Sequence, residues 1–348
     1  MKNVYLLILI SIIFIGFVNY YLYLFNKKKE IFNDVFLPNK QEKLFLYDQY
    51  FKLFAKLYKN NLLPNKILLT GQSGLGKSTF AYHFINFILS DKEDCPYDFM
   101  NFTINSLNRS FLLINQKYHP NFFLIENFND KQIIDIKQVK NMIGFVNKTS
   151  YEKKIKFILI DNAEYLNLSS VNALLKIVEE PPPNTFIIFV HNSSIKLIET
   201  LKSRCIEFKI FFSNQERQKI LENLLTYYDL KIDINLLENI KSFYDSPGII
   251  LHLVKLINEA VIDVSNPNLI NVISNLMEFI LRNKNNTNLN LLQNTIELFF
   301  FQELKKTNNK RKISLNYSKV LESLNSFRKY NIDMNNTFYE IKENIVHG

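Results

Sequence analysis

Three of the seven glycines in the chain, Gly71, Gly74 and Gly76, fall in one short stretch. The stretch fits the pattern G-x-x-x-x-G-K-[ST], and it ends on Lys77 and Ser78. Glycines let consecutive backbone N–H groups surround an anion, and the start of a helix adds a favourable dipole. The lysine of such a loop reaches the β- and γ-phosphates of a nucleotide, and the hydroxyl holds Mg²⁺. We therefore predict a nucleotide-binding loop, rather than a glycine turn without a ligand, formed by Gly71, Gln72, Ser73, Gly74, Leu75, Gly76, Lys77, Ser78 and Thr79.

An aspartate at the end of an apolar run is the second candidate. Residues 156–161 read KFILID, which predicts a buried parallel strand ending in Asp161. Ligands bind at the carboxyl ends of such strands, so Asp161 is expected to hold Mg²⁺ together with Ser78, in preference to an ordinary turn role. Hydrolysing enzymes of this kind need a base beside the aspartate. Asn162 cannot serve as one, and Glu164 is expected to point elsewhere.

The elements around these residues alternate between strands and helices. Apolar runs predict strands at residues 67–70, 122–125, 156–161 and 185–190, and residues 206–210 can supply a fifth. Helical patterns cover residues 47–59, 79–89, 133–146 and 171–180, the last of them stopped by three prolines, and residues 90–120 are expected to be loop-like. Strands alternating with helices behind a phosphate loop predict a five-stranded parallel α/β sheet.

The rest of the chain has a helical pattern only. A capping box, S-x-x-E, begins a helix at Ser213. Breaks are expected near residues 245–248 and 265–268. The basic run at residues 305–312 is interpreted as a solvated surface loop rather than a DNA site.

Composition limits the class of protein. With 348 residues, 47% hydrophobic and 22% charged, the chain is typical of a globular protein with two or three domains. The net charge of +9 would suit nucleic acid or an anionic membrane, but a chain rich in Lys, Asn, Ile and Phe is also what an A+T-rich genome encodes. Cys95 and Cys205 cannot form a four-ligand zinc site or a disulfide framework, which indicates a reducing compartment.

The N-terminal segment is a separate problem. Residues 4–25 are almost unbroken apolar sequence, long enough to span a bilayer, and tyrosines and then Lys27–Lys29 follow. The lysines would keep the rest of the chain in the cytoplasm, tethered to the inner membrane. A cleaved signal peptide fits poorly, because no small-residue cleavage site follows. A start codon placed too far upstream, with the native chain beginning near Ile31, is the equal alternative.

Several blocks occur in a characteristic order: ILLTGQSGLGKST, a His-Pro pair before the second strand, FILIDNAEYLN, NALLKIVEEPPPNTFIIF, and Ser203-Arg204-Cys205. This order resembles the AAA+ subunits of DNA sliding-clamp loaders, and among these the bacterial delta-prime subunits of DNA polymerase III. The resemblance begins near Ile31 and is densest over residues 65–210. It implies an AAA+ P-loop core at residues 31–211, a helical lid at 212–264 and an all-α collar at 265–348, with residues 1–30 outside it.

The resemblance also implies roles for single residues. Arg204 would be an arginine finger that acts in trans on a neighbouring subunit's ATP. Asn192 falls at the sensor 1 position, which faces the γ-phosphate, whereas residues 248–250 lack the sensor 2 arginine of active relatives. With Asn162, this departure implies ATP or ADP and Mg²⁺ binding with little hydrolysis. The implied partners are the other subunits of a hetero-oligomeric ring and, through the ring, the sliding clamp and primed DNA.

Two other functions remain open. An autonomous AAA+ ATPase would hydrolyse ATP in isolation, which Asn162 argues against. A membrane-tethered AAA+ interaction module rests entirely on residues 4–25. The resemblance favours the cytoplasmic clamp-loader subunit over both.

Overall fold

The computed structural model describes residues 37–127, 133–147, 155–259, 269–283, 289–307, 309–330 and 332–346. The chain divides into two compact units. Of the described residues, the first unit contains 37–44 and 78–119, and the second contains 45–77 and those from 120 onward. The predicted boundaries of core, lid and collar stay predictions.

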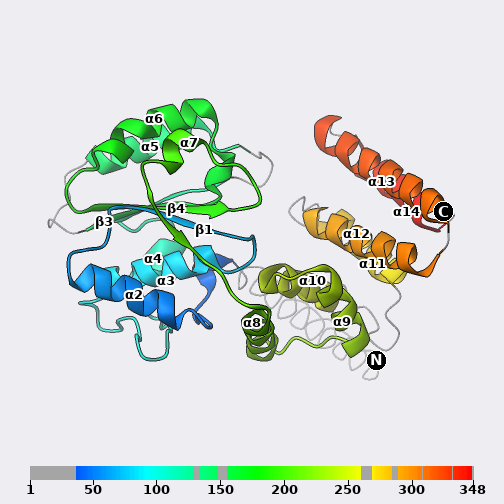
Figure 1. Ribbon diagram of the computed structural model, residues 1–348, viewed down its shortest axis with the longest axis horizontal. Coiled ribbons are helices and arrows are strands. Elements are labelled where there is room, and N and C mark those ends of the chain that lie inside the picture. Colours follow the sequence, from blue (N-terminus) through cyan, green and yellow to red (C-terminus); the bar gives the residue numbers. More distant parts are fainter. Residues whose placement is uncertain are drawn as a thin grey trace, which may run out of the picture. The chain divides into compact units, whose positions relative to one another are not determined.

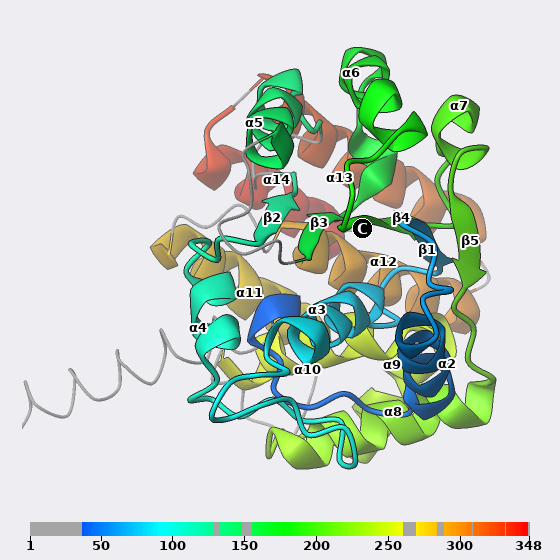
Figure 2. The same ribbon diagram turned by 90° about the vertical axis from the view of Figure 1, so that its left-hand side faces the viewer.

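A five-stranded parallel sheet forms the centre of the second unit, as the sequence predicts. Its strands are β1 (Lys66–Gly71), β2 (Phe122–Ile125), β3 (Lys156–Ile160), β4 (Thr185–Asn192) and β5 (Ile206–Lys209). They lie in the order β2-β3-β4-β1-β5, which can be followed from left to right in Figure 2. The register pairs Gly71 with Asn192. The start of the glycine loop and the sensor 1 position therefore lie side by side at the carboxyl edge of the sheet.

Helices cover both faces of this sheet. The helices α5 (Ile136–Asn147), α6 (Leu168–Glu179) and α7 (Glu199–Lys202) lie on one side and α2 (Asp48–Lys59) on the other (Figure 1). A buried cluster that includes Ile160, Leu174 and Phe189 fills the first interface. On the other face, the ring centroids of Phe54 in α2 and Phe208 in β5 are 4.7 Å apart. Burial on both faces explains why β1, β3 and β4 are nearly continuous apolar runs, whereas β5 is partly exposed and alternates apolar with charged residues.

The first unit contains a helix that the sequence did not reveal. The first unit consists of the short 3-10 helix η1 (Pro38–Lys40), α3 (Lys77–Leu89) and α4 (Arg109–Asn115). Helix α4 is the one that was not expected, because it falls in the stretch predicted to be loop-like. The side chain of Asn108 caps α4 by accepting the N–H of Phe111 at 2.7 Å. His83 is fully buried between the Gln41 carbonyl and the Tyr97 hydroxyl, and burial lowers its pKa to about 3. The imidazole is therefore a neutral structural group.

Seven helices follow the sheet in the described part of the second unit: α8 (Asn214–Tyr227), α9 (Ile234–Phe243), α10 (Pro247–Glu259), α11 (Leu269–Asn283), α12 (Leu289–Lys306), α13 (Lys310–Tyr330) and α14 (Met334–Val346). The predicted capping box is confirmed, because Ser213 caps α8 and Glu216 returns a bond to the Ser213 backbone. One apolar cluster runs from Leu221 in α8 to Ile345 in α14. The expected break near residue 245 is present, and the one at 265–268 lies outside the described residues.

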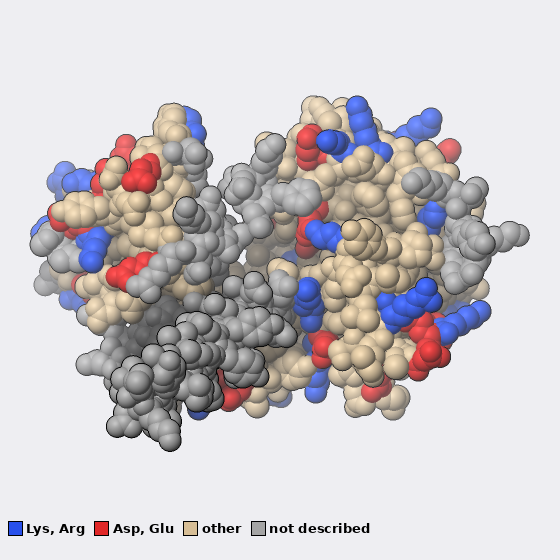
Figure 3. Space-filling view, turned by 180° about the vertical axis from the view of Figure 1, so that it is seen from behind, with Lys and Arg blue, Asp and Glu red and all other residues tan. Residues whose placement is uncertain are grey.

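The predictions for the basic run at 305–312 and for the apolar segment at 4–25 have different outcomes. The basic run at 305–312 is mostly exposed where it is described, as predicted for a solvated surface, but α12 ends at Lys306 and α13 begins at Lys310, so the predicted loop is limited to the connection between these helices. Basic side chains (Lys and Arg) and acidic side chains (Asp and Glu) are interspersed on the face shown in Figure 3 rather than gathered by sign. Residues 4–25, the predicted membrane helix, lie outside the described residues. Within the ranges that the structure describes, no helix combines the length and apolar character needed to span a membrane.

Candidate nucleotide-binding site

The glycine loop has the backbone that its sequence requires. Gly74 and Gly76 have φ angles of +75° and +85°, in the left-handed region that favours glycine. At Gly71 a Cβ atom would lie 2.5 Å from the Ile210 carbonyl oxygen. Each of the three glycines is therefore needed for the shape of the loop.

The carbonyl groups of five consecutive loop residues are all engaged. Lys77 Nζ donates to the carbonyls of Gly71 at 2.8 Å and Gln72 at 2.6 Å. The Ser246 hydroxyl donates to the Ser73 carbonyl at 2.7 Å. The Gly248 N–H donates to the Gly74 carbonyl at 2.9 Å, and the Tyr47 hydroxyl donates to the Leu75 carbonyl at 2.9 Å. Among the described residues, the backbone N–H groups of 73–76 have no acceptor. A loop with its carbonyls satisfied and its amides unpaired is suited to an anion.

Lys77 is the buried cation of the loop, with 5% of its surface exposed. Burial lowers the pKa of its ammonium group to about 8, while the carboxylates of Glu164 and Asp161 oppose that shift. The group is still mostly protonated at neutral pH. Its hydrogen bonds to Gly71 and Gln72 engage two of the three N–H donors of the ammonium group.

The turn after β3 carries Asp161 and Asn162. Asp161 directly follows β3, and its Oδ1 accepts the Asn162 N–H at 3.0 Å. Asn162 has φ +54°, and its side chain donates to Asn127 Oδ1 at 3.0 Å. Asn162 is thus tied to the end of β2, and its amide has no basic group to offer.

The expectation that Glu164 points elsewhere is wrong. Its Oε2 accepts the backbone N–H of Asn192 at 3.1 Å, and its charge acts on Lys77 more strongly than that of Asp161. Glu164 takes this position because the backbone of Asn162 has a left-handed conformation and the 3-10 turn η2 (Ala163–Tyr165) follows it. Together they return the chain to the ends of the strands. A carboxylate therefore lies at the site, although not at the position where the sequence pattern places it.

The other predicted contacts are arranged as follows. Asn192 is the last residue of β4, and its Oδ1 accepts the Ser194 N–H at 3.1 Å. Ser78 and Thr79 lie in the first turn of α3 and are half-buried. The pairing of Ser78 with Asp161 at Mg²⁺, and the contact of Asn192 with a γ-phosphate, stay predictions.

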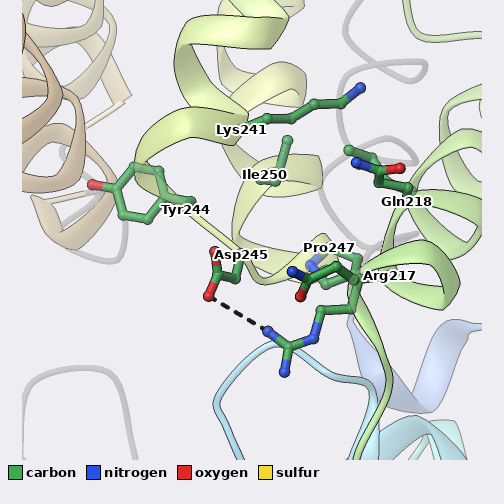
Figure 4. A pocket seen from close by; sticks show the side chains of 9 residues that line it. Arg217, Gln218, Lys241, Tyr244, Asp245, Pro247 and Ile250 are labelled. Atoms are coloured by element: carbon green, nitrogen blue, oxygen red, sulfur yellow. Dashed lines mark ion pairs between the residues drawn. The ribbon is translucent and has the colours of Figure 1, made fainter.

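Sequence reasoning missed a cation beside the loop. Arg217, in the first turn of α8, donates through Nη1 to Gln72 Oε1 at 3.1 Å and through Nε to the Phe212 carbonyl at 2.9 Å. Its Nη1 also lies 3.6 Å from Asp245 Oδ2, the ion pair drawn in Figure 4. Arg217 and Asp245 line a pocket of about 140 Å³ between α8 and the α9–α10 turn. The capping box at Ser213 located this helical turn, but only the fold could show that it meets Gln72.

Arg204 lies at the opposite end of β1 from the glycine loop. It precedes Ile206, which pairs with Ile67 at the beginning of β1. Its guanidinium contacts Glu179, whose carbonyl accepts Lys66 Nζ at 3.4 Å. Lys66 and Gly71 are the two ends of β1, about 16 Å apart at roughly 3.3 Å per residue. The structure therefore does not bring Arg204 to the chain's own loop.

Comparison with known proteins gives matches to subunits of DNA polymerase III. Residues 47–213 match the family model described as DNA polymerase III, delta subunit. The chain is 29% identical over 147 residues to the DNA polymerase III subunit delta' of Pseudomonas aeruginosa, covering 40% of this chain and 41% of that protein. It is 26% identical over 197 residues to the same subunit of Buchnera aphidicola subsp. Schizaphis graminum, covering 57% of each. The predicted resemblance to delta-prime subunits is confirmed, and the chain spans about half the length of the curated relatives it matches.

A DNA polymerase III, gamma subunit-related protein from Thermotoga maritima has 13% identity and a TM-score of 0.44, and the match covers 83% of this chain and 97% of that one.

Proposed function

We propose that this chain is a delta-prime-like subunit of the DNA polymerase III clamp loader. It binds ATP or ADP with Mg²⁺ at residues 71–79 and Asp161, hydrolyses it slowly or not at all, and offers Arg204 to the ATP of a neighbouring subunit. The other subunits of the ring are its partners, and the ring loads the sliding clamp on DNA. Tethering of the chain through residues 4–25 stays a prediction.

The position of Arg204 is the observation that carries this proposal. The guanidinium lies beside the beginning of β1, whereas the glycine loop begins at its end. A cation that cannot reach its own nucleotide is suited to act on that of a neighbour, as an arginine finger supplied in trans does. The match over residues 47–213 contains both the loop and Arg204.

The chemistry at the chain's own loop supports slow hydrolysis. Asn162 stands where a base is needed and is tied to Asn127. Lys77 is folded onto the loop carbonyls, and Gly248 contacts the loop through its backbone rather than through a cationic side chain. These features describe a site that holds a nucleotide more readily than it cleaves one.

Glu164 favours the second candidate, an autonomous ATPase. Its carboxylate lies at the strand ends beside Asn192 and influences Lys77, so a carboxylate base is available near the site. The isolated protein would then hydrolyse ATP, and turnover would be lost in both Lys77→Ala and Glu164→Gln. Absence of turnover by the wild-type chain alone excludes this candidate.

The test of the first candidate is Arg204→Ala in the assembled complex. DNA-dependent ATP hydrolysis should fall about 10³-fold or more, which is the lower end of what an arginine finger contributes. Lys202→Ala, which removes a cation from the end of α7, is the matched control and should retain activity. Gel filtration should show that both variants assemble. Wild-type hydrolysis rates with an assembled Arg204→Ala subunit would exclude the finger.

A further inference from the structure

The guanidinium of Arg204 is held within its own chain. Its Nε donates to Glu179 Oε1 at 2.8 Å, and its Nη2 lies 2.8 Å from the same oxygen. Its Nη1 donates to the Thr200 carbonyl at 2.7 Å. A guanidinium carries five N–H donors, so with one donor of each nitrogen engaged, two remain. The side chain is therefore oriented without being saturated.

The backbone that carries Arg204 is fixed by its own turn. The N–H groups of Ser203, Arg204 and Cys205 donate to the carbonyls of Glu199, Leu201 and Lys202 at 2.9–3.2 Å. The remaining freedom belongs to the side chain, which is 35% exposed. An exposed arginine has many rotamers, and binding a phosphate would cost that entropy unless the side chain is oriented beforehand.

Glu179 lies at the C-terminal end of helix α6. It is the last residue of α6, because the three prolines that follow cannot continue the helix. The Glu180 N–H closes the final turn on the Lys176 carbonyl at 3.3 Å. In the described structure, the side chain of Glu180 makes no hydrogen bond or ion pair, which makes it a matched comparison for its neighbour.

We propose that Glu179 is a positioning residue for Arg204, an inference that rests on the proposed role of Arg204 as a finger. Glu179 fixes the Nε side of the guanidinium, and the two remaining donors are the number that a bidentate phosphate contact requires. A carboxylate that instead competed with the phosphate would inhibit the neighbour. The two roles have opposite signs, so one measurement separates them.

The experiment compares Glu179→Ala with Glu180→Ala in the assembled complex. For Glu179→Ala, kcat of DNA-dependent ATP hydrolysis should fall about tenfold, the scale of a misoriented catalytic group, while KM for ATP stays unchanged. Glu180→Ala should match the wild type. In the double variant Glu179→Ala/Arg204→Ala, hydrolysis should be no slower than in Arg204→Ala alone, because Glu179 acts only through Arg204.

Three results would overturn the proposal: a higher kcat in Glu179→Ala, equal kcat in the Glu179 and Glu180 variants, or an additive loss in the double variant. A normal rate in Arg204→Ala would instead overturn the proposed function. Should Glu179→Ala fail to assemble, Glu179→Gln keeps the size of the side chain and should show a smaller fall in kcat. An unchanged kcat in that variant would count against the positioning role.

Discussion

The two ends of β1 are built in opposite ways. At the carboxyl end, the glycine loop is held by residues far away in the sequence, including Tyr47, Ser246 and Gly248. At the amino end, Arg204 is held by a local turn and by one partly exposed carboxylate. The first site depends on tertiary packing, whereas the second depends on one ion pair.

This difference matches the roles proposed for the two sites. A loop that holds its own ligand gains from a cage whose shape exists before the ligand arrives. A group that serves a neighbour has to remain at the surface, where its ion pair contributes little to folding. Substitutions near the loop should therefore affect the free energy of unfolding, and substitutions near Arg204 should affect only the activity of the assembly.

The largest effect on folding is expected at Gly248. A Cβ atom at this position would lie 2.6 Å from the Gly74 carbonyl oxygen and 3.0 Å from Gly74 Cα. Both are backbone atoms and cannot rotate away, so Gly248→Ala should force α10 from the loop. We expect a loss of about 2–3 kcal/mol, the scale of overpacking a close contact. Thermal unfolding of the wild-type protein and of Gly248→Ala measures this loss of stability.

Gly144 provides the control for this change. It lies within α5, and a Cβ atom there would meet nothing within 4 Å. Gly144→Ala should raise the melting temperature, because alanine is favoured over glycine in a helix by up to about 1 kcal/mol. Equal melting temperatures for the two variants would show that the contact between Gly248 and Gly74 does not constrain the loop.

The second prediction concerns the pH dependence of nucleotide binding. Burial lowers the pKa of Lys77 to about 8, against the pull of Glu164 and Asp161. Phosphates favour the charged form, so the free protein must take up a proton to bind above this pH. Affinity for ADP should be level below about pH 8 and fall by up to about tenfold per pH unit above it.

Calorimetric titration of ADP across this range measures the profile. Lys77→Arg is the control, because a guanidinium stays protonated throughout and should give a level profile. A level profile for the wild-type protein would show that Lys77 does not contact the phosphates.

A smaller change is expected from Glu164→Gln. Of the two carboxylates that raise the pKa of Lys77, Glu164 has the larger effect, so its removal should lower that pKa further. The pH at which ADP affinity begins to decline should therefore move below about 8. Glu207→Gln, on β5, removes a charge that does not act on Lys77 and should leave the profile in place. The same profile in both variants would place Glu164 too far from Lys77 to matter.

The sequence predicted the framework of the site better than its side-chain directions. The central strands β1, β3 and β4 were predictable because a strand buried on both faces is a continuous apolar run, whereas the edge strand β5 is partly exposed and gave a weaker pattern. Helix α4 was missed because it has only seven residues, and its clearest signal is the capping Asn108. Glu164 was placed wrongly because the left-handed conformation of Asn162 reverses the chain, and no strand pattern shows that.

The contacts that hold the loop could not be predicted for a different reason. Arg217 and Ser246 meet residues 72–73 across separations of 145 and 173 residues. No periodicity or local spacing connects positions so far apart, and only the folded helices bring them together. The position of Arg204 in the order of the motifs was visible in the sequence, whereas its bond to Glu179 was not.

The smallest effect on folding is expected at Glu179. The pair with Arg204 is partly exposed on both sides, with 35% and 51% of the side-chain surfaces accessible, and such pairs contribute about 0–1 kcal/mol. Glu179→Ala should therefore shift the melting temperature little, and no more than Glu180→Ala does. Added salt should reduce even this difference, because exposed charges are screened. A large loss of stability confined to Glu179→Ala would show that the amino end of β1 depends on this pair for folding, and the contrast between the two ends of the strand would then disappear.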